Sequence, residues 1–291
     1  MFTEILFPTD GSQGASAAFD HVLDIAAAHE STVHVLNVAN TTRDSVLQIQ
    51  GEIVDGLERQ GERLVAETAD QAQERGVNAV TAVHQGEPYS TICEYAESSD
   101  IDLIVMPTHG RQGLKRFLLG STTERVVRRA SVPVLTLRPD GDAPTYPYRR
   151  VLVPTDGSEC AREALTIGTD VANAENAALH LLSAIATVSL GVDVRSDIQM
   201  SMLEETANEI LADAAAYAAA AGVEPVAETV EYGPSIQRAI RSYVEGHDID
   251  LVVVGTHGRT GLDRYLLGSV TEHLVRTASI PVLTVRNTSS E

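Results

Sequence analysis

Two glycine-rich segments contain the residues whose types and spacing are best suited to hold an anion. They read Thr108-His109-Gly110-Arg111-Gln112-Gly113, continuing to Gly120-Ser121, and Gly255-Thr256-His257-Gly258-Arg259-Thr260-Gly261, continuing to Gly268-Ser269. Glycines let backbone amides approach a phosphate without a Cβ in the way, and they tolerate positive φ. Each final Gly-Ser pair precedes a predicted helix, whose N-terminal amides and dipole favour an anion. We therefore expect each segment to bind phosphate.

A structural interpretation of the same serines stays open beside this one. Ser121 and Ser269 each begin an S-x-x-E sequence, which is the pattern of a helix capping box. Capping explains neither the preceding glycines nor the histidine, and it is compatible with an anion site. The GK[ST] ending of a Walker A loop is absent, as is G-x-G-x-x-G, so rapid phosphoryl transfer is not expected.

The histidines and arginines of these segments also have two interpretations. His109 and His257 have the chemistry of general bases or metal ligands, but no second ligand lies at suitable spacing nearby. A role in stiffening the loop or contacting phosphate is favoured, so we predict no catalytic residue and no metal site. The arginines, which are suited either to phosphate charge or to solvent, are Arg111, Arg116, Arg259 and Arg264.

A second pair of polar segments follows the first predicted strand of each half of the chain. These segments are Pro8-Thr9-Asp10-Gly11-Ser12 and Pro154-Thr155-Asp156-Gly157-Ser158. An aspartate here is able to accept hydrogen bonds from a ribose hydroxyl or a base amine. An Asx turn or a helix cap explains the same residue equally well.

Hydrophobic periodicity predicts alternating strands and helices. In the first half we expect strands at 3–8, 32–38, 77–84, 102–106 and 133–137, and helices at 14–29, 45–75, 88–97 and 121–130. In the second half we expect strands near 149–154, 178–185, 225–231, 250–254 and 281–285, with a long helix over about 202–221. Such alternation predicts an α/β fold with two doubly wound, parallel, five-stranded sheets. Sheets of this kind bind ligands beyond the carboxyl ends of their strands, where the strand order reverses.

The two halves are copies of each other. Residues 5–12 (ILFPTDGS) match 151–158 (VLVPTDGS), and residues 101–137 align without a gap with 249–285, where two thirds of the positions are identical. A repeat of half the chain length indicates two domains rather than a solenoid. We expect domains at 1–138 and 149–287, joined by a short proline-containing linker at 139–148.

Composition narrows the partners and the compartment. A formal net charge of −20 over 291 residues disfavours nucleic acid and anionic membranes. Two cysteines, Cys93 and Cys160, form neither a disulfide framework nor a zinc site. The N-terminus lacks the apolar core of a signal peptide, and no apolar run reaches the roughly 20 residues of a membrane span. We therefore expect a cytoplasmic protein.

Together these motifs resemble the universal stress protein family in its tandem two-domain form. The family pattern G-x2-G-x9-G-[ST] is complete in the second copy, at Gly255, Gly258, Gly268 and Ser269, and PTDGS resembles the family's opening. The resemblance covers nearly the whole chain and implies a site for ATP, with AMP or ADP as alternatives and Mg²⁺ as a companion of the nucleotide.

The resemblance also implies residue roles. Asp156 would contact the ribose or base, Ala184 would offer its backbone to adenine, and Gly258, Gly268, Ser269, Val270 and Thr271 would hold phosphates. The first-copy counterparts are Asp10, Val38, Gly110, Gly120, Ser121, Thr122 and Thr123. The expected site also includes Pro8, Thr9, His109, Arg111, Pro154, Thr155, Gly255, His257 and Arg259.

The first copy departs from the family pattern at one position. Pro107 stands where the first glycine is expected, and proline has no amide hydrogen and adds a ring. We therefore expect weaker binding or none in the first copy and the better site in the second. The family also pairs domains through the last strand, so residues 133–137 and 281–285 are expected to pair within the chain as a pseudo-dimer, or with another chain as a homodimer.

Three functional classes remain open. The leading one is a nucleotide-binding stress-response sensor or adaptor, in which any ATP hydrolysis is slow. An adenylyl-transfer or pyrophosphatase enzyme is disfavoured, because those ATP pyrophosphatases carry an SGG-type loop where this chain has TDGS. The third class is a dimerisation or interaction module that binds no nucleotide.

The acidic composition leads to a prediction about salt. The chain carries 41 acidic residues but a single lysine, Lys115, among its 21 basic residues, a balance suited to high salt, where screening removes self-repulsion. The free energy of unfolding is expected to rise from dilute buffer to molar salt in denaturant titrations. Equal stability at both salt concentrations would contradict this adaptation.

Overall fold

The structure is a computed structural model of two compact units, Met1–Tyr146 and Pro147–Glu291. It describes residues 1–40, 51–109, 119–139, 144–187, 194–258 and 267–287, without the side chains of residues 51–55 and 194–197. Among the described residues, no helix has the length and apolar character needed to cross a membrane.

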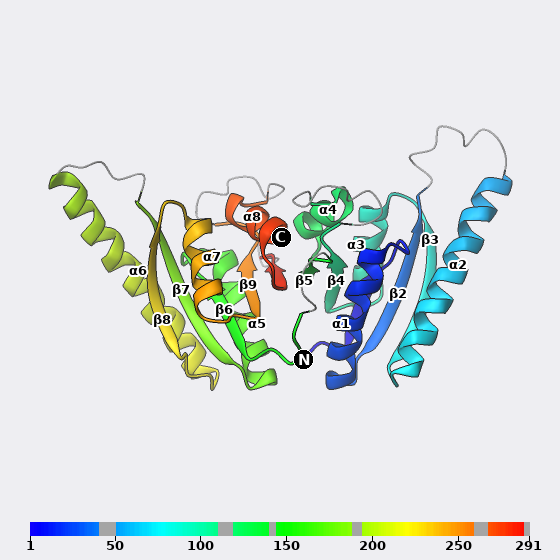
Figure 1. Ribbon diagram of the computed structural model, residues 1–291, viewed down its shortest axis with the longest axis horizontal. Coiled ribbons are helices and arrows are strands. Elements are labelled where there is room, and N and C mark those ends of the chain that lie inside the picture. The colour runs from blue at the N-terminus through cyan, green and yellow to red at the C-terminus, as the bar shows by residue number, and fades with distance from the viewer. Residues whose placement is uncertain (41–50, 110–118, 140–143, 188–193, 259–266, 288–291) are drawn as a thin grey trace. The chain divides into compact units, whose positions relative to one another are not determined.

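The first unit is a five-stranded parallel sheet with helices between its strands (Figure 1). Its elements are β1 (Glu4–Pro8), α1 (Gln13–His29), β2 (Thr32–Ala39), α2 (Gly51–Glu74), β3 (Asn78–Gln85), α3 (Pro88–Ser98), β4 (Leu103–Pro107), α4 (Ser121–Arg129) and β5 (Val134–Leu137). The strand order is β3-β2-β1-β4-β5, and every neighbouring pair is parallel. The order therefore reverses between β1 and β4.

The second unit repeats this arrangement. Its elements are β6 (Arg150–Pro154), α5 (Glu159–Glu175), β7 (Ala178–Ala186), α6 (Val194–Ala220), β8 (Ala227–Gly233), α7 (Ile236–Gly246), β9 (Leu251–Gly255), α8 (Ser269–Thr277) and β10 (Val282–Val285). The order β10-β9-β6-β7-β8 is again parallel throughout and reverses between β6 and β9. The predicted doubly wound α/β class is confirmed in both units, although α6 begins earlier than the expected residue 202.

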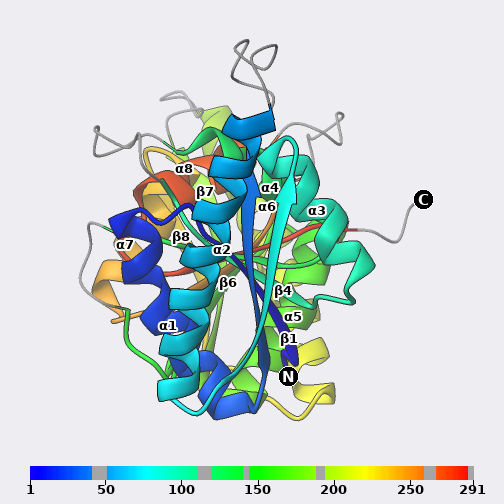
Figure 2. The same ribbon diagram turned by 90° about the vertical axis from the view of Figure 1, so that its right-hand side faces the viewer.

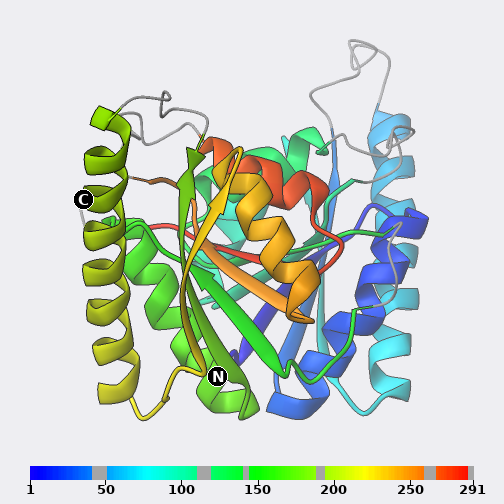
Figure 3. The same ribbon diagram turned by 60° about the vertical axis from the view of Figure 1, so that its left-hand side comes forward.

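Helices cover both faces of each sheet. In the first unit α1 and α2 lie on one side of the strands and α3 and α4 on the other (Figure 2). In the second unit α6 and α7 lie on opposite sides of β7 and β8 (Figure 3). The central strands are consequently buried: Ile5, Leu6 and Ile104 are 0% exposed. Continuous apolar strands suit this two-sided burial.

One buried histidine fixes the end of the first unit to its first helix. His21 on α1 is 2% exposed and meets the ring of Tyr146 edge-on, with 5.8 Å between the ring centroids. The Tyr146 hydroxyl also lies 2.9 Å from Nε2 of His29 on the same helix. Burial lowers the pKa of the His21 imidazole from 6.5 to about 4, and Asp24 opposes this shift in part. His21 is therefore neutral in the folded chain near pH 7.

This pKa predicts how stability depends on pH. The unfolded chain binds a proton at His21 near pH 6.5, whereas the folded chain does so only near pH 4. The contribution of neutral His21 to the free energy of unfolding is therefore fully present above pH 6.5 and is lost as the pH falls toward 4. The loss is expected to be about 3 kcal/mol. When the free energy of unfolding is measured with urea between pH 4.5 and 7, it should change less with pH in His21→Leu than in wild type. His84→Gln, at an exposed histidine, is the matched control; an unchanged slope in His21→Leu would contradict this origin.

Candidate functional site

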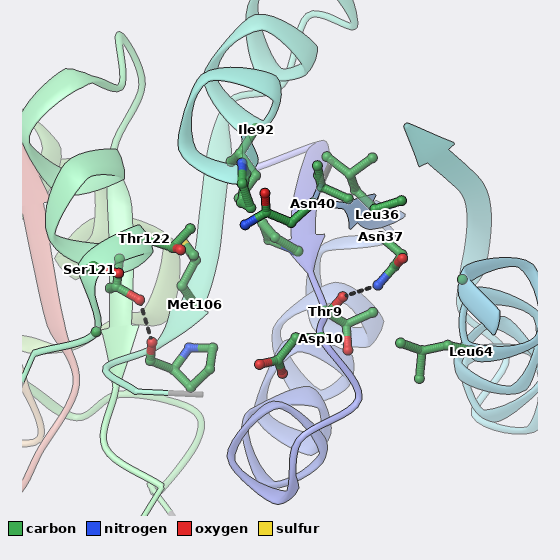
Figure 4. Close-up of a pocket in the computed structure, with 18 of the residues that line it drawn as sticks. Thr9, Asp10, Leu36, Asn37, Asn40, Leu64, Ile92, Met106, Ser121 and Thr122 are labelled. Atoms are coloured by element: carbon green, nitrogen blue, oxygen red, sulfur yellow. Dashed lines mark hydrogen bonds between the residues drawn. The ribbon is translucent and has the colours of Figure 1, made fainter. Parts of the chain in front are cut away.

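A cavity of about 670 Å³ opens at the carboxyl ends of the strands in the first unit (Figure 4). It lies where the strand order reverses, which is the ligand-binding position of such sheets. The predicted residues that line it are Pro8, Thr9, Asp10, Val38, His109, Gly120, Ser121, Thr122 and Thr123. The fold thus brings the carboxyl ends of β1 and β2, the residues just after β1 and β4, and the start of α4 to one place. The predicted residues Gly110, Arg111 and Arg116 lie outside the described part of the chain.

Of the other lining residues, only Pro107 was predicted from the sequence to lie at the site. They come from the end of β2, from one face of α2, from α3 and β4, and from the segment before α4: Leu36, Asn37, Ala39, Asn40, Leu57, Gln60, Gly61, Leu64, Pro88, Ile92, Met106, Pro107 and Leu119. The α2 members recur at helical spacing, which is the signal that would have marked one face of the helix. That this face turns toward the strand ends is a property of the packing.

The aspartates after β1 and β6 both form local turns. Ser12 N donates to Asp10 Oδ1 at 3.0 Å, and Ser158 N donates to Asp156 Oδ1 at 3.0 Å. The intervening glycines, Gly11 and Gly157, have φ of 72° and 75°. The Asx-turn interpretation is therefore confirmed. It coexists with a place at the site, because Asp10 also lines the cavity.

Asp156 and Gly258 meet in the second unit. A Cβ added at Gly258 would stand 2.7 Å from Asp156 Oδ2, a separation too short for real atoms. A larger residue at position 258 would have to displace the Asp156 carboxylate, which comes from another loop. The loop after β6 and the glycine-rich loop after β9 are therefore neighbours, as the sequence pattern requires. Arg259 and Arg264, which belong to the same loop, lie outside the described residues.

The glycine-rich segments close on themselves in the same way in both units. Gly120 N donates to Thr108 O at 2.7 Å, and Gly268 N donates to Thr256 O at 2.8 Å. In each unit a threonine hydroxyl lies against the following histidine. Thr108 Oγ1 is 3.2 Å from His109 Nδ1, and Thr256 Oγ1 is 2.9 Å from His257 Nδ1. These contacts restrain the histidine rings, as a loop-stiffening role for the histidines requires.

The capping-box interpretation of the serines is wrong. The N-caps of α4 and α8 are Gly120 and Gly268, without a side-chain cap bond, so Ser121 and Ser269 are the first helical residues. The chain enters each helix one residue earlier than a capping box would have it. Glu124 N makes the first helical bond of α4, to Gly120 O at 2.9 Å. The amides of residues 121–123 precede it and have no acceptor within the helix, and all three residues line the cavity.

The remaining predicted residues of the second unit lie at or near the ends of its strands and at the start of α8. Pro154 ends β6, and Thr155 N donates to Leu182 O at 2.8 Å, as Thr9 N does to Leu36 O in the first unit. Ala184 lies near the end of β7, two residues beyond Leu182. Thr271 Oγ1 donates to Gly255 O at 2.7 Å, which ties the start of α8 to the end of β9. Val270 is half-buried beside it.

Pro107 changes less than the sequence pattern suggests. Thr123 Oγ1 donates to Pro107 O at 2.9 Å, the same bond that Thr271 makes to Gly255, and Thr108 N still donates to Leu137 O at 2.8 Å. A Cβ at Gly255 would stand 2.9 Å from the Cβ of Cys160 and 2.7 Å from its carbonyl carbon. The first-unit counterpart of Cys160 is Gly14, which has no Cβ. A Cβ added at Gly14 would stand 2.9 Å from His109 O, in the loop after β4.

The chain is similar to proteins of known family along its whole length. The model of the universal stress protein family matches residues 1–138 and again 147–286. The chain belongs to the universal stress protein family. It is 35% identical over 141 residues to universal stress protein MJ0531 of Methanocaldococcus jannaschii, covering 47% of this chain and 83% of that relative. The family is one of stress-response proteins, and the double match shows its tandem form.

Two further comparisons cover most of this universal stress protein. Universal stress protein Mb2028c of Mycobacterium bovis is 30% identical over 244 residues, covering 79% of this chain and 78% of the relative. The crystal structure of a universal stress protein from Archaeoglobus fulgidus superposes with a TM-score of 0.75 at 23% identity, covering 97% and 98% of the two chains. This structural likeness supports the fold.

The close approach at Gly255 in this universal stress protein leads to a mutational prediction. Gly255→Ala is expected to destabilise the chain by about 1–3 kcal/mol, because the new Cβ would stand 2.7 Å from the carbonyl carbon and oxygen of Cys160. Chemical denaturation measures the loss. Gly246→Ala, whose Cβ would meet nothing within 4 Å, is the control; a loss no larger than that of the control would contradict the packing account.

Proposed function

We propose that this universal stress protein binds adenine nucleotides at the carboxyl ends of its strands and acts as a sensor or adaptor. The observation that carries the proposal is the first-unit cavity of about 670 Å³, a size typical of small-molecule sites. Residues chosen from the sequence for nucleotide binding line it together. The family membership supports the same conclusion.

The two ends of the cavity differ in chemistry, as a nucleotide requires. One end is bounded by apolar side chains, among them Leu36 and Leu64, which suit a planar base. The other end is bounded by Gly120 and the first turn of α4, whose amides and dipole suit phosphates. Asp10 lies between them, within reach of a ribose (Figure 4). The expected ligand is ATP, with AMP or ADP as alternatives and Mg²⁺ accompanying the phosphates.

We propose the second unit as the tighter site. Its glycine pattern is complete, and Gly258 stands directly against Asp156. In the first unit Pro107 removes one amide hydrogen from the end of β4. Pairing of the units through residues 133–137 and 281–285 stays a prediction.

Binding, rather than turnover, is the proposed activity. A ligand that binds one conformation better stabilises it by mass action, and so reports its own concentration to a partner. His109 and His257 are each next to a threonine hydroxyl, a contact suited to stiffening the loop. The GK[ST] ending that supports rapid phosphoryl transfer is absent from the sequence, so any ATP hydrolysis is expected to be slow.

Calorimetry with matched variants tests this proposal. Wild type, Gly258→Val and Gly110→Val are titrated with ATP, ADP, AMP and GTP at high salt with Mg²⁺. Gly258→Val should weaken the tight adenine site at least tenfold, because its side chain would displace the Asp156 carboxylate. Gly110→Val, the matching change in the first unit, should leave that site intact. Absence of binding to wild type at millimolar nucleotide would overturn the proposal in favour of an interaction module.

A further inference from the structure

The outward face of α6 carries large apolar side chains into solvent. Ile198 and Met202, one turn apart on this helix, are 63% and 64% exposed. The helix packs on β7, β8 and α5 through its other side, where Ala207, Leu211 and Ala218 are buried (Figure 3). A single exposed apolar residue is ordinary on a protein surface, whereas neighbouring ones on one helix face are typical of a contact surface.

The exposed residues of this face follow the spacing of a helix-pairing seam. Alternating steps of four and three residues lead along α6 from position 198 to position 219, and every residue on that line is exposed. Apolar residues occupy its two ends and glutamates its centre. We call this line the α6 seam: Ile198, Met202, Glu205, Glu209, Ala212, Ala216 and Ala219. A second helix packed on the seam would cover all of it.

The corresponding helix of the first unit has no such seam. Val77 N donates to Ala72 O as Val223 N does to Ala218 O, which aligns α2 with α6 residue by residue. The α2 residues at the seam positions carry both signs of charge and no large apolar side chain: Glu52, Gly56, Arg59, Arg63, Ala66, Asp70 and Gln73. Because α2 takes the same place on its own sheet without a seam, the fold does not require the apolar residues of the α6 seam.

The charges of α6 indicate which partner fits the seam. Residues 198–220 include no Lys, Arg or His, and their acidic residues are Glu204, Glu205, Glu209 and Asp213. Glu205 and Glu209 stand where α2 has arginines. A second copy of α6, packed antiparallel with its alanines against the apolar end of the first, would bring the central glutamates of both copies together, and their repulsion opposes that pairing. Charge complementarity therefore favours a basic partner.

We propose that the α6 seam is a docking surface for a basic amphipathic helix of a partner protein. Apolar side chains of that helix cover Ile198 and Met202, and Met adapts its shape to such contacts. The alanines allow close approach of the two helices, and Lys or Arg at the centre of the partner helix lies against Glu205 and Glu209. The seam faces away from the sheet, so this inference goes beyond the proposed nucleotide binding and does not depend on it.

Calorimetry of the full chain with a designed helical peptide tests this inference. The probe peptide has leucine and alanine along one face and two lysines at its centre, and the control peptide has glutamates in place of the lysines. The probe should bind one site per chain, about tenfold more tightly than the control peptide. Absence of probe binding to wild type at millimolar peptide would overturn the inference.

Introducing charge at the apolar end separates docking from general attraction to an acidic protein. Ile198→Glu with Met202→Glu should weaken probe binding by about tenfold, because the apolar contact is lost. Attraction by net charge alone would instead strengthen binding, since this variant adds two carboxylates, and that result would overturn the inference. If melting shows that this variant is unfolded, Ile198→Gln with Met202→Gln replaces it, with the same expected loss; unchanged binding by the glutamine variant would overturn the inference.

Charge reversal on the two helices is the matched control. Glu205→Arg with Glu209→Arg should weaken probe binding by about tenfold. Glu67→Arg with Asp70→Arg makes the same change in net charge on exposed residues of α2, and should alter binding by less than about twofold. Equal losses in the two variants would overturn the assignment to α6.

Sedimentation of wild type decides between a basic partner and a second copy of the chain. The inference predicts no concentration-dependent association that depends on the seam. A dimer that Ile198→Glu with Met202→Glu dissociates would overturn the inference in favour of pairing between two copies of α6.

Discussion

The parallel hydrogen-bond ladder on the two sides of β1, and its counterpart around β6, is the interaction on which the rest of the structure depends. Residues 4–8 pair with β2 over the whole strand, whereas only Ile5 and Leu6 pair with β4. Beyond that shared register the chains leaving β1 and β4 diverge to opposite faces of the sheet, and the cavity opens between them. Thr9 N, bonded to Leu36 O, continues the ladder one residue past β1 and holds Asp10 at the rim.

Close packing at this end of the sheet is achieved with glycines that face particular partners. Gly258 faces a carboxylate, Gly61 faces an amide and Gly255 faces the backbone of a helix start. A Cβ would stand under 3 Å from another group at each position, but only at Gly255 is that group backbone, which cannot move aside as a side chain can.

The sequence predicted the sheets well because fully buried strands leave continuous apolar runs, such as Leu103 to Met106, and because the repeat doubled every signal. It predicted the polar rim at Asp10 and Gly120 because glycines and aspartates mark turns after strands. The capping-box interpretation of Ser121, one of the two left open by the sequence, was wrong, since S-x-x-E does not reveal that the N-cap is Gly120. Asn37 and Gly61 were missed, because their relation exists only once α2 packs on β2.

The most direct measurement of the account is a crystal structure of the chain soaked with a non-hydrolysable ATP analogue. The account predicts density for the base beside Ala184 and for the phosphates at the first turn of α8, with weaker density at the corresponding places beside Val38 and α4. Density in neither unit, or a nucleotide bound away from the carboxyl ends of the strands, would contradict it.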